Sequence, residues 1–130
     1  MVCLETTFLV DFFRGNKNAI EKYTEIKESN ESIRVAVPSI TEIISGASLN
    51  VKNEEKERAI EFFSNLEILE LNKESAIIAG EIEAGLILSG ETIGIIDIMI
   101  GAICLSNNET LLTRNKKHFE KIKNLEIKSY

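Results

Sequence analysis

Short apolar runs alternate with longer amphipathic segments along the whole chain. The short runs are rich in Val, Ile and Leu and are bounded by polar or turn-forming residues, which predicts buried strands. We expect these strands at residues 2–4, 33–37, 66–71, 110–113 and 125–129.

Between these runs, apolar residues recur at intervals of three and four, which predicts amphipathic helices. The predicted helices cover residues 6–15, 17–28, 38–47, 53–65, 73–89, a central segment around Asp97, and residues 115–122. Strands that alternate with helices favour a parallel sheet with helices on both faces. We therefore predict one α/β domain over residues 1–130, a three-layer α/β/α fold with a mostly parallel sheet of about five strands and the first strand near its middle.

The composition is that of an ordinary folded domain, with 44% hydrophobic and 28% charged residues in a chain of 130. No apolar run reaches the roughly 18 residues that a membrane span requires. Glu5 and Asp11 interrupt any apolar core of a signal peptide at the start of the chain. We therefore expect a cytoplasmic protein.

Cys3 and Cys104 lie far apart in apolar patterns, which favours buried free thiols over a disulfide.

The net charge of −6 argues against a surface that binds polyanions in general. It leaves room for a nuclease, because an acidic pocket carries part of that charge and bound cations neutralise it. No glycine-rich phosphate-binding loop occurs. A phospho-receiver domain is disfavoured, because the paired acids that it needs after its first strand are absent.

Asp97 is the most conspicuous polar residue, because its neighbours from Ile93 to Leu105 are nearly all apolar or small. A carboxylate in such surroundings must be paired, metal-bound or protonated, since burying it bare is too costly. The alternative is an acid in the first turn of a helix that interacts with its own backbone.

Three acids occupy matched places in the predicted topology. Glu5 ends the first strand, Glu42 lies in the first turns of the helix after the second strand, and Asp97 begins the helix before the fourth. In a right-handed parallel sheet with the first strand central, all three reach the same edge. Such carboxylates repel unless a hard cation such as Mg²⁺ or Mn²⁺ joins them. At least one pKa should then be raised, with Asp97 the first candidate. Separately, Glu5 could end an edge strand and Glu42 could be a solvated helix residue.

Three stretches together resemble a known family. They are LETTFLVDFFRG, PSITEIISGA and GETIGIIDIMIGAICLSNNETLLTRNKKHFEKIKNLEI, and they are similar to the PIN domain, above all to the VapC toxins of VapBC toxin–antitoxin pairs. The resemblance implies a PIN-like fold and an endoribonuclease that depends on Mg²⁺ or Mn²⁺. It also implies a homodimer, and a small VapB-like antitoxin that blocks the acidic groove.

The resemblance also implies roles for individual residues. Glu5, Glu42 and Asp97 fall on the first three catalytic and metal-binding acids, Asn115 falls at or near the fourth polar position, and Thr113 lies where the family often has a hydroxyl. Two features depart from the family pattern. Glu5 replaces the usual Asp, and the extra methylene disturbs the strict octahedral geometry of Mg²⁺. Asn115 supplies no charge. The alternative is therefore a catalytically weakened module that acts by binding RNA or an antitoxin.

Other polar residues receive weaker assignments. His118 is the only histidine, and we expect it to pack beside Phe119 or face solvent. Arg14 and Arg114 are candidates for RNA phosphate contacts, with surface salt bridges as the simpler alternative. The charged segments 17–31 and 53–58 are solvated helix faces whose apolar stripes suit a dimer or an antitoxin helix.

Overall fold

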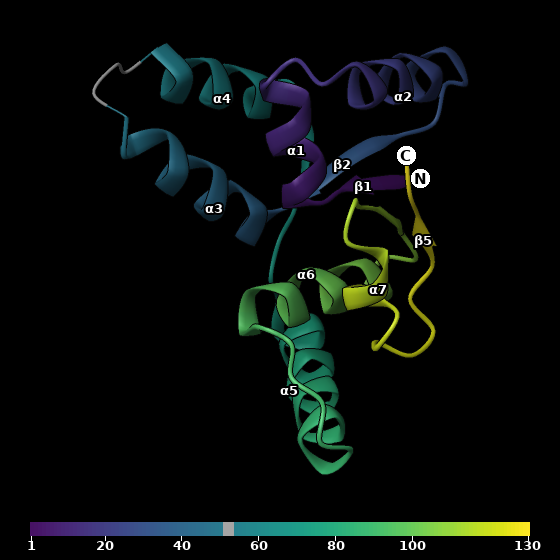
Figure 1. Ribbon diagram of the computed structural model, residues 1–130. Helices are drawn as coiled ribbons and strands as arrows, with labels where there is room; N and C mark the ends of the chain where they lie inside the picture. Colours follow the sequence, from purple (N-terminus) through teal and green to yellow (C-terminus); the bar gives the residue numbers. More distant parts are fainter. Residues whose placement is uncertain (51–53) are drawn as a thin grey trace.

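In the computed structural model, which describes residues 1–50 and 54–130, five parallel strands form one sheet in the order β3-β2-β1-β4-β5. The strands are β1 (Val2–Leu4), β2 (Ile33–Ala36), β3 (Glu67–Leu69), β4 (Thr110–Leu112) and β5 (Ile127–Lys128). Strand β1 lies in the middle, and the two termini lie close together (Figure 1). The predicted parallel sheet with a central first strand is confirmed.

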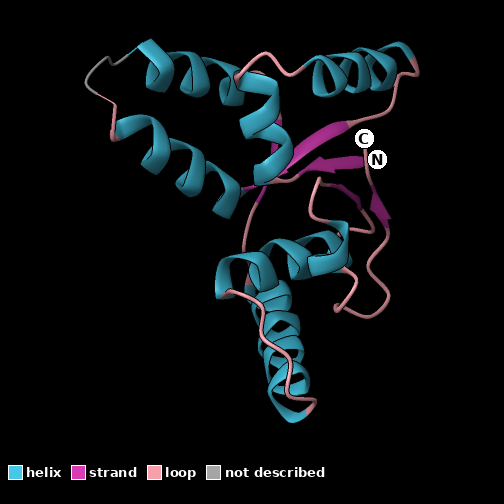
Figure 2. Ribbon diagram, viewed as in Figure 1, coloured by secondary structure: helices cyan, strands magenta, loops and turns pink. Residues whose placement is uncertain are grey.

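Helices cover both faces of the sheet (Figure 2). They are α1 (Thr6–Phe13), α2 (Lys17–Glu28), α3 (Val37–Ser48), α4 (Glu54–Ser64), α5 (Lys73–Leu88), α6 (Ile95–Ser106) and α7 (Lys116–Phe119). Helices α1 to α4 lie on one side of the sheet and α5 to α7 on the other (Figure 1). The start of the predicted helix 53–65, at Asn53, lies outside the described residues.

The alternation of side chains along each strand divides the core into two apolar clusters. On β1, Val2 and Leu4 pack with Phe8 of α1 against one face, while Cys3 packs with Ile100 of α6 against the other. Cys3 and Cys104 are both buried and free, as predicted. The central strands β1 and β4 are therefore buried on both faces and are nearly continuous apolar runs, whereas the edge strands β3 and β5 carry the exposed residues Glu67 and Lys128.

Local sequence signals set several boundaries. Helix α1 ends before Gly15, whose φ of +79° is unfavourable for other residues. Pro38 stands in the first turn of α3, so Val37 belongs to this helix rather than to the predicted strand 33–37. Asn72 and Ser75 form a capping box at the start of α5.

Among the described residues, no helix is long and apolar enough to cross a membrane.

Candidate active site

The carboxyl ends of β1 and β4 lie side by side at the centre of the sheet, because Leu4 pairs with Leu112. Glu5 follows β1 directly, and Thr113 follows β4. Helices α3 and α6, which carry Glu42 and Asp97, pack against each other. In parallel α/β folds, this edge is where ligands bind.

Glu5 is almost completely buried, with 2% of its surface exposed. It is the N-cap of α1, and its Oε2 atom accepts three hydrogen bonds: from the Thr7 backbone N–H (3.0 Å), the Thr7 hydroxyl (2.5 Å) and the Thr113 hydroxyl (2.7 Å). Burial raises the pKa of the Glu5 carboxyl, and the nearby Asp97 carboxylate adds to that rise, although the three donors oppose it. The raised pKa expected among these acids therefore falls on Glu5.

Thr113 joins the two strand ends. Its hydroxyl donates to Glu5, accepts from the Asn115 backbone N–H (2.9 Å) and lies 3.2 Å from the Thr7 hydroxyl. The Arg114 backbone N–H donates in turn to the Thr7 hydroxyl (3.1 Å). Thr113 is completely buried, so this network is shielded from water.

Glu42 is oriented by the residue next to Glu5. The Thr6 hydroxyl donates to Glu42 Oε1 (2.7 Å) and lies 3.1 Å from Ser39 Oγ. This contact links the end of β1 to α3, because Thr6 follows Glu5 directly in the chain and its hydroxyl bonds to Glu42.

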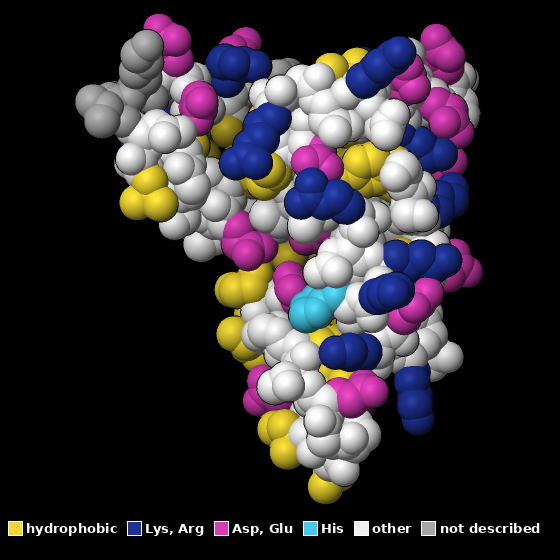
Figure 3. Space-filling view, in the orientation of Figure 1, with side chains coloured by type: hydrophobic (Ala, Val, Ile, Leu, Met, Phe, Trp, Pro, Cys, Tyr) yellow, Lys and Arg dark blue, Asp and Glu magenta, His cyan; other side chains and the backbone are white. Residues whose placement is uncertain are grey.

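Asp97 lies in the first turn of α6, and its side chain is 25% exposed rather than buried. Its Oδ2 atom lies 2.8 Å from His118 Nε2. The His118 ring also meets Phe119 edge-on at 5.6 Å, as expected from the sequence. The single histidine, cyan in Figure 3, lies beside an acidic side chain. The contact with Asp97 was missed by sequence reasoning. The sequence contained one indication of this contact: the predicted helix that contains His118 begins at the carboxyl edge of the sheet, where Asp97 was also expected.

Asn115, the predicted fourth polar residue, is exposed and begins α7 without a side-chain capping bond. Asn115 therefore lies near the carboxyl end of β4, but its side-chain amide forms no hydrogen bond to any of the three carboxylates among the described residues.

Asp11, Arg114 and Tyr130 form a second polar group that sequence reasoning missed. Asp11 is buried; its Oδ1 accepts from Arg114 Nη1 (2.7 Å) and its Oδ2 from the Tyr130 hydroxyl (2.5 Å). Burial and the Asp11 carboxylate raise the pKa of Tyr130. Arg114 therefore forms the ion pair that was the simpler alternative, and it anchors the segment after β4 to α1.

The donor chemistry of the three carboxylates fits a hard divalent cation. In each of Glu5, Glu42 and Asp97, one oxygen is held by a hydroxyl or an imidazole, and the described residues offer no hydrogen bond to the other. Within the described ranges, however, no three His, Cys, Asp or Glu side chains form a group that could by themselves hold an ion. Mg²⁺ typically takes only one or two protein carboxylates and completes its shell with water and phosphate.

The five-stranded parallel sheet, with Glu5 at the carboxyl end of its central strand, defines an α/β fold of the kind that binds ligands at this edge. The model of the PIN domain matches residues 2–125, and the chain belongs to this family. PIN-domain ribonucleases generally depend on a divalent metal.

Within the family, the chain is similar to VapC proteins. It is 33% identical to the tRNA(fMet)-specific endonuclease VapC of Salmonella typhimurium over 88% of each chain. It is 27% identical to ribonuclease VapC2 of Rickettsia felis, over 98% of this chain and 96% of that one. The crystal structure of VapBC2 from Rickettsia felis bound to a promoter DNA fragment superposes with a TM-score of 0.89 at 26% identity, covering 100% and 99% of the two chains.

Proposed function

We propose that this chain is a metal-dependent endoribonuclease and the toxin of a VapBC-like pair, acting in the cytoplasm. The observation that carries the proposal is the group of Glu5, Glu42 and Asp97 at the carboxyl edge of the sheet, each with one oxygen held in place and one left for a ligand. The similarity to VapC ribonucleases supports the same reaction.

We assign the metal as Mg²⁺ or Mn²⁺, because both prefer oxygen ligands. Glu5, Glu42 and Asp97 would hold it, with Asn115 as a weak or indirect ligand. When bound, a divalent cation supplies positive charge that acidifies water and stabilises negative charge on the phosphodiester.

The other polar side chains position these acids. Thr7 and Thr113 hold Glu5 Oε2, and His118 holds Asp97 Oδ2. Such partners fix the orientation of a ligand and tune its basicity. An RNA phosphate at this edge would complete the coordination, so the chain binds its substrate and its metal at one place.

A protein partner is the other part of the proposal. The structures of VapB–VapC complexes support a small VapB-like antitoxin, and we propose a homodimer of the present chain. Large apolar side chains are exposed on α5 and at the start of α6: Ile77, Ile87, Leu88 and Ile95. Figure 3 shows several hydrophobic side chains on the surface of the lower half of the molecule. Exposed apolar side chains that lie together often form a protein–protein interface.

Replacement of Asp97 tests the enzyme directly. We expect the parent to cleave single-stranded RNA with Mg²⁺ or Mn²⁺ and to stop in EDTA, while Asp97→Asn is slower by at least about 100-fold, since removing a metal ligand removes the charge that the reaction needs. Glu81→Gln, an exposed acid on α5, is the control and should cleave like the parent. Equal rates for Asp97→Asn and the parent would refute the assignment.

The burial of Glu5 favours the alternative of a binding module that has lost catalysis. A buried carboxyl with a raised pKa resists the charged form that a metal requires. Calorimetric titration with Mn²⁺ separates the two functions. Tight binding by both the parent and Glu5→Asp supports the enzyme, whereas binding only by Glu5→Asp supports the module.

A further inference from the structure

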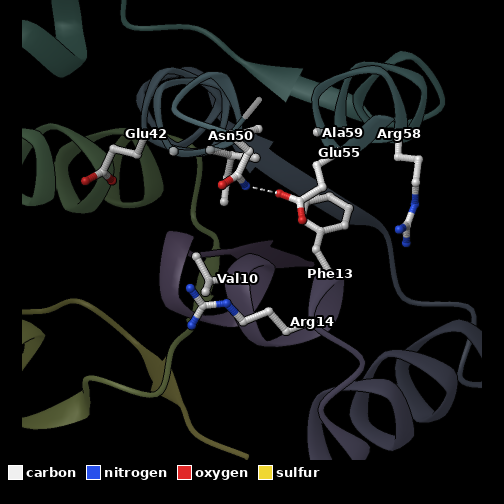
Figure 4. Close-up of a pocket in the computed structure, with 11 residues that line it drawn as sticks. Val10, Phe13, Arg14, Glu42, Asn50, Glu55, Arg58 and Ala59 are labelled. Atoms are coloured by element: carbon white, nitrogen blue, oxygen red, sulfur yellow. Dashed lines mark hydrogen bonds between the residues drawn. The ribbon is translucent and has the colours of Figure 1, made fainter. Parts of the chain in front are cut away.

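A pocket of about 260 Å³ lies between α1, α3 and α4, next to the candidate active site (Figure 4). Its walls combine apolar with polar and charged side chains and come from all three helices; the apolar part includes Val10 and Phe13 on α1, Ile43 on α3 and Ala59 on α4. Ligand pockets in proteins span roughly 300 to 1,000 Å³. This pocket therefore has room for a flat fragment such as one nucleobase, but not for a larger ligand.

Phe13 gives the pocket a rigid aromatic surface. Its ring meets the ring of Phe62 edge-on at 5.1 Å and that of Phe63 at 6.3 Å. These contacts hold the ring in one orientation. A fixed aromatic ring suits a base of any identity, since every base presents a π-face.

Two arginines flank the apolar wall. Arg14 follows α1 and extends toward the end of the pocket where Glu42 lies, while Arg58 of α4 stands at the other end (Figure 4). Both are exposed, and neither forms an ion pair with any described residue. The acid between them, Glu55, accepts a hydrogen bond from the Asn50 amide (2.5 Å). Glu42 and Glu55 also line the pocket, so the two arginines make its lining formally neutral in a chain with a net charge of −6.

Glu42 links the pocket to the candidate active site. It lines the pocket and also accepts the hydrogen bond from Thr6, the residue beside Glu5. The pocket and the predicted acids therefore share one side chain.

We propose that this pocket is a subsite for the nucleotide flanking the two joined by the scissile phosphate. Its base lies against Phe13 and the apolar wall, and the adjoining phosphates contact Arg14 and Arg58. An arginine matches phosphate oxygens with two parallel hydrogen bonds. This inference rests on the proposed ribonuclease function and adds to it the residues that bind the substrate outside the metal site.

Binding of a fluorescein-labelled single-stranded RNA of about ten nucleotides tests the subsite, since single-strand sites span roughly 4 to 16 nucleotides. Fluorescence anisotropy is measured at several salt concentrations in the cleavage-deficient Asp97→Asn background. We expect Arg14→Ala and Arg58→Ala each to weaken binding about 3- to 10-fold. Each should also reduce the slope of log K against log salt by about 0.7, the value for one phosphate contact on a single strand.

Three further variants separate charge from shape. Arg14→Lys should keep the parental salt slope, because it retains the charge. Phe13→Leu should weaken binding about 5-fold without changing the slope, since base stacking releases no counterions. Lys123→Ala is the control: this exposed cation lies in the loop before β5, at the opposite edge of the sheet, and should change neither quantity.

Kinetics distinguish this inference from the proposed function. With the otherwise unaltered chain and Mn²⁺, Arg14→Ala should raise KM for the longer RNA with kcat within about 2-fold of the parent. It should leave the cleavage of a dinucleotide unchanged, because only contact with the flanking nucleotide is lost. A parent that neither cleaves nor binds RNA refutes the ribonuclease itself. A parent that cleaves, with both arginine variants binding RNA at the parental affinity and salt slope, overturns the subsite alone.

Discussion

Replacing Thr113 by Val removes one hydroxyl from the centre of the site with almost no change in shape. The lost hydrogen bond to Glu5 Oε2 is 2.7 Å long and completely buried. Hydrogen bonds to charged groups contribute about 1.5 to 3 kcal/mol, and removing a donor leaves the buried carboxylate with fewer partners. The Asn115 backbone N–H also loses its acceptor, but Asn115 is exposed and its N–H can donate to water instead. We therefore expect a loss of about 2 to 3 kcal/mol in the free energy of unfolding.

The loss should depend on pH. The Thr113 hydroxyl lowers the pKa of Glu5, so its removal allows burial to raise that pKa further. A group with a raised folded-state pKa binds protons more readily in the folded chain, and its contribution to stability disappears as the pH rises through that pKa. The deficit of Thr113→Val should thus be larger at pH 8 than at pH 5. Metal affinity should also fall by about 10- to 100-fold, as for other residues that orient a ligand.

Urea denaturation at both pH values in EDTA, together with calorimetric titration with Mn²⁺ at pH 8, measures these effects. Thr110→Val is the matched control, because it is the same substitution at the first residue of β4, the strand that Thr113 follows, and removes only a bond to the exposed Glu126 (3.1 Å). It should change the free energy of unfolding by less than about 0.5 kcal/mol. Equal stability and equal Mn²⁺ affinity for the two variants would refute the role assigned to Thr113.

Two further predictions concern buried carboxyl groups. Burial raises the pKa of Glu5, so its ionisation destabilises the metal-free fold as the pH rises; Glu5→Gln should melt higher than the parent at pH 8 in EDTA, with the difference shrinking toward pH 4. A lower melting temperature for Glu5→Gln at pH 8, followed by differential scanning fluorimetry, would contradict this. At the opposite edge of the sheet, Arg34 pairs with Glu109, whose side chain is completely buried and whose Oε2 has no partner among the described residues. Arg34→Met should reduce stability to urea by about 2 to 4 kcal/mol, below the upper range for a broken buried pair because Arg34 is 19% exposed, and adding Glu109→Leu should restore most of it. No recovery in the double variant would show that packing rather than charge explains the loss.

The order of strands and helices could be predicted from the sequence because it depends on local patterns. Continuous apolar runs indicate strands buried on both faces, and their alternation with amphipathic helices leaves a parallel sheet as the simple solution. That topology also brings Glu5 and Thr113 to one edge, because the carboxyl ends of parallel strands point the same way. The resemblance to the PIN domain led to the same residues independently.

Burial of the acids was decided only by the tertiary structure. Asp97 has the most apolar neighbours in the sequence, but successive residues of a helix point in different directions, and its own side chain faces the open edge of the site. Glu5 lies where the carboxyl ends of β1 and β4 meet the start of α1. These elements bury its side chain, and burial raises the pKa of the Glu5 carboxyl.

The polar partners of these acids also could not be predicted from local patterns. His118 meets Asp97 from 21 residues away, and Tyr130 meets Asp11 from 119 residues away. The pocket between α1, α3 and α4 likewise has walls from three separate segments. Periodicity reports which face of an element is apolar, whereas contacts between distant side chains depend on how the packed elements are oriented, and only the folded chain determines that.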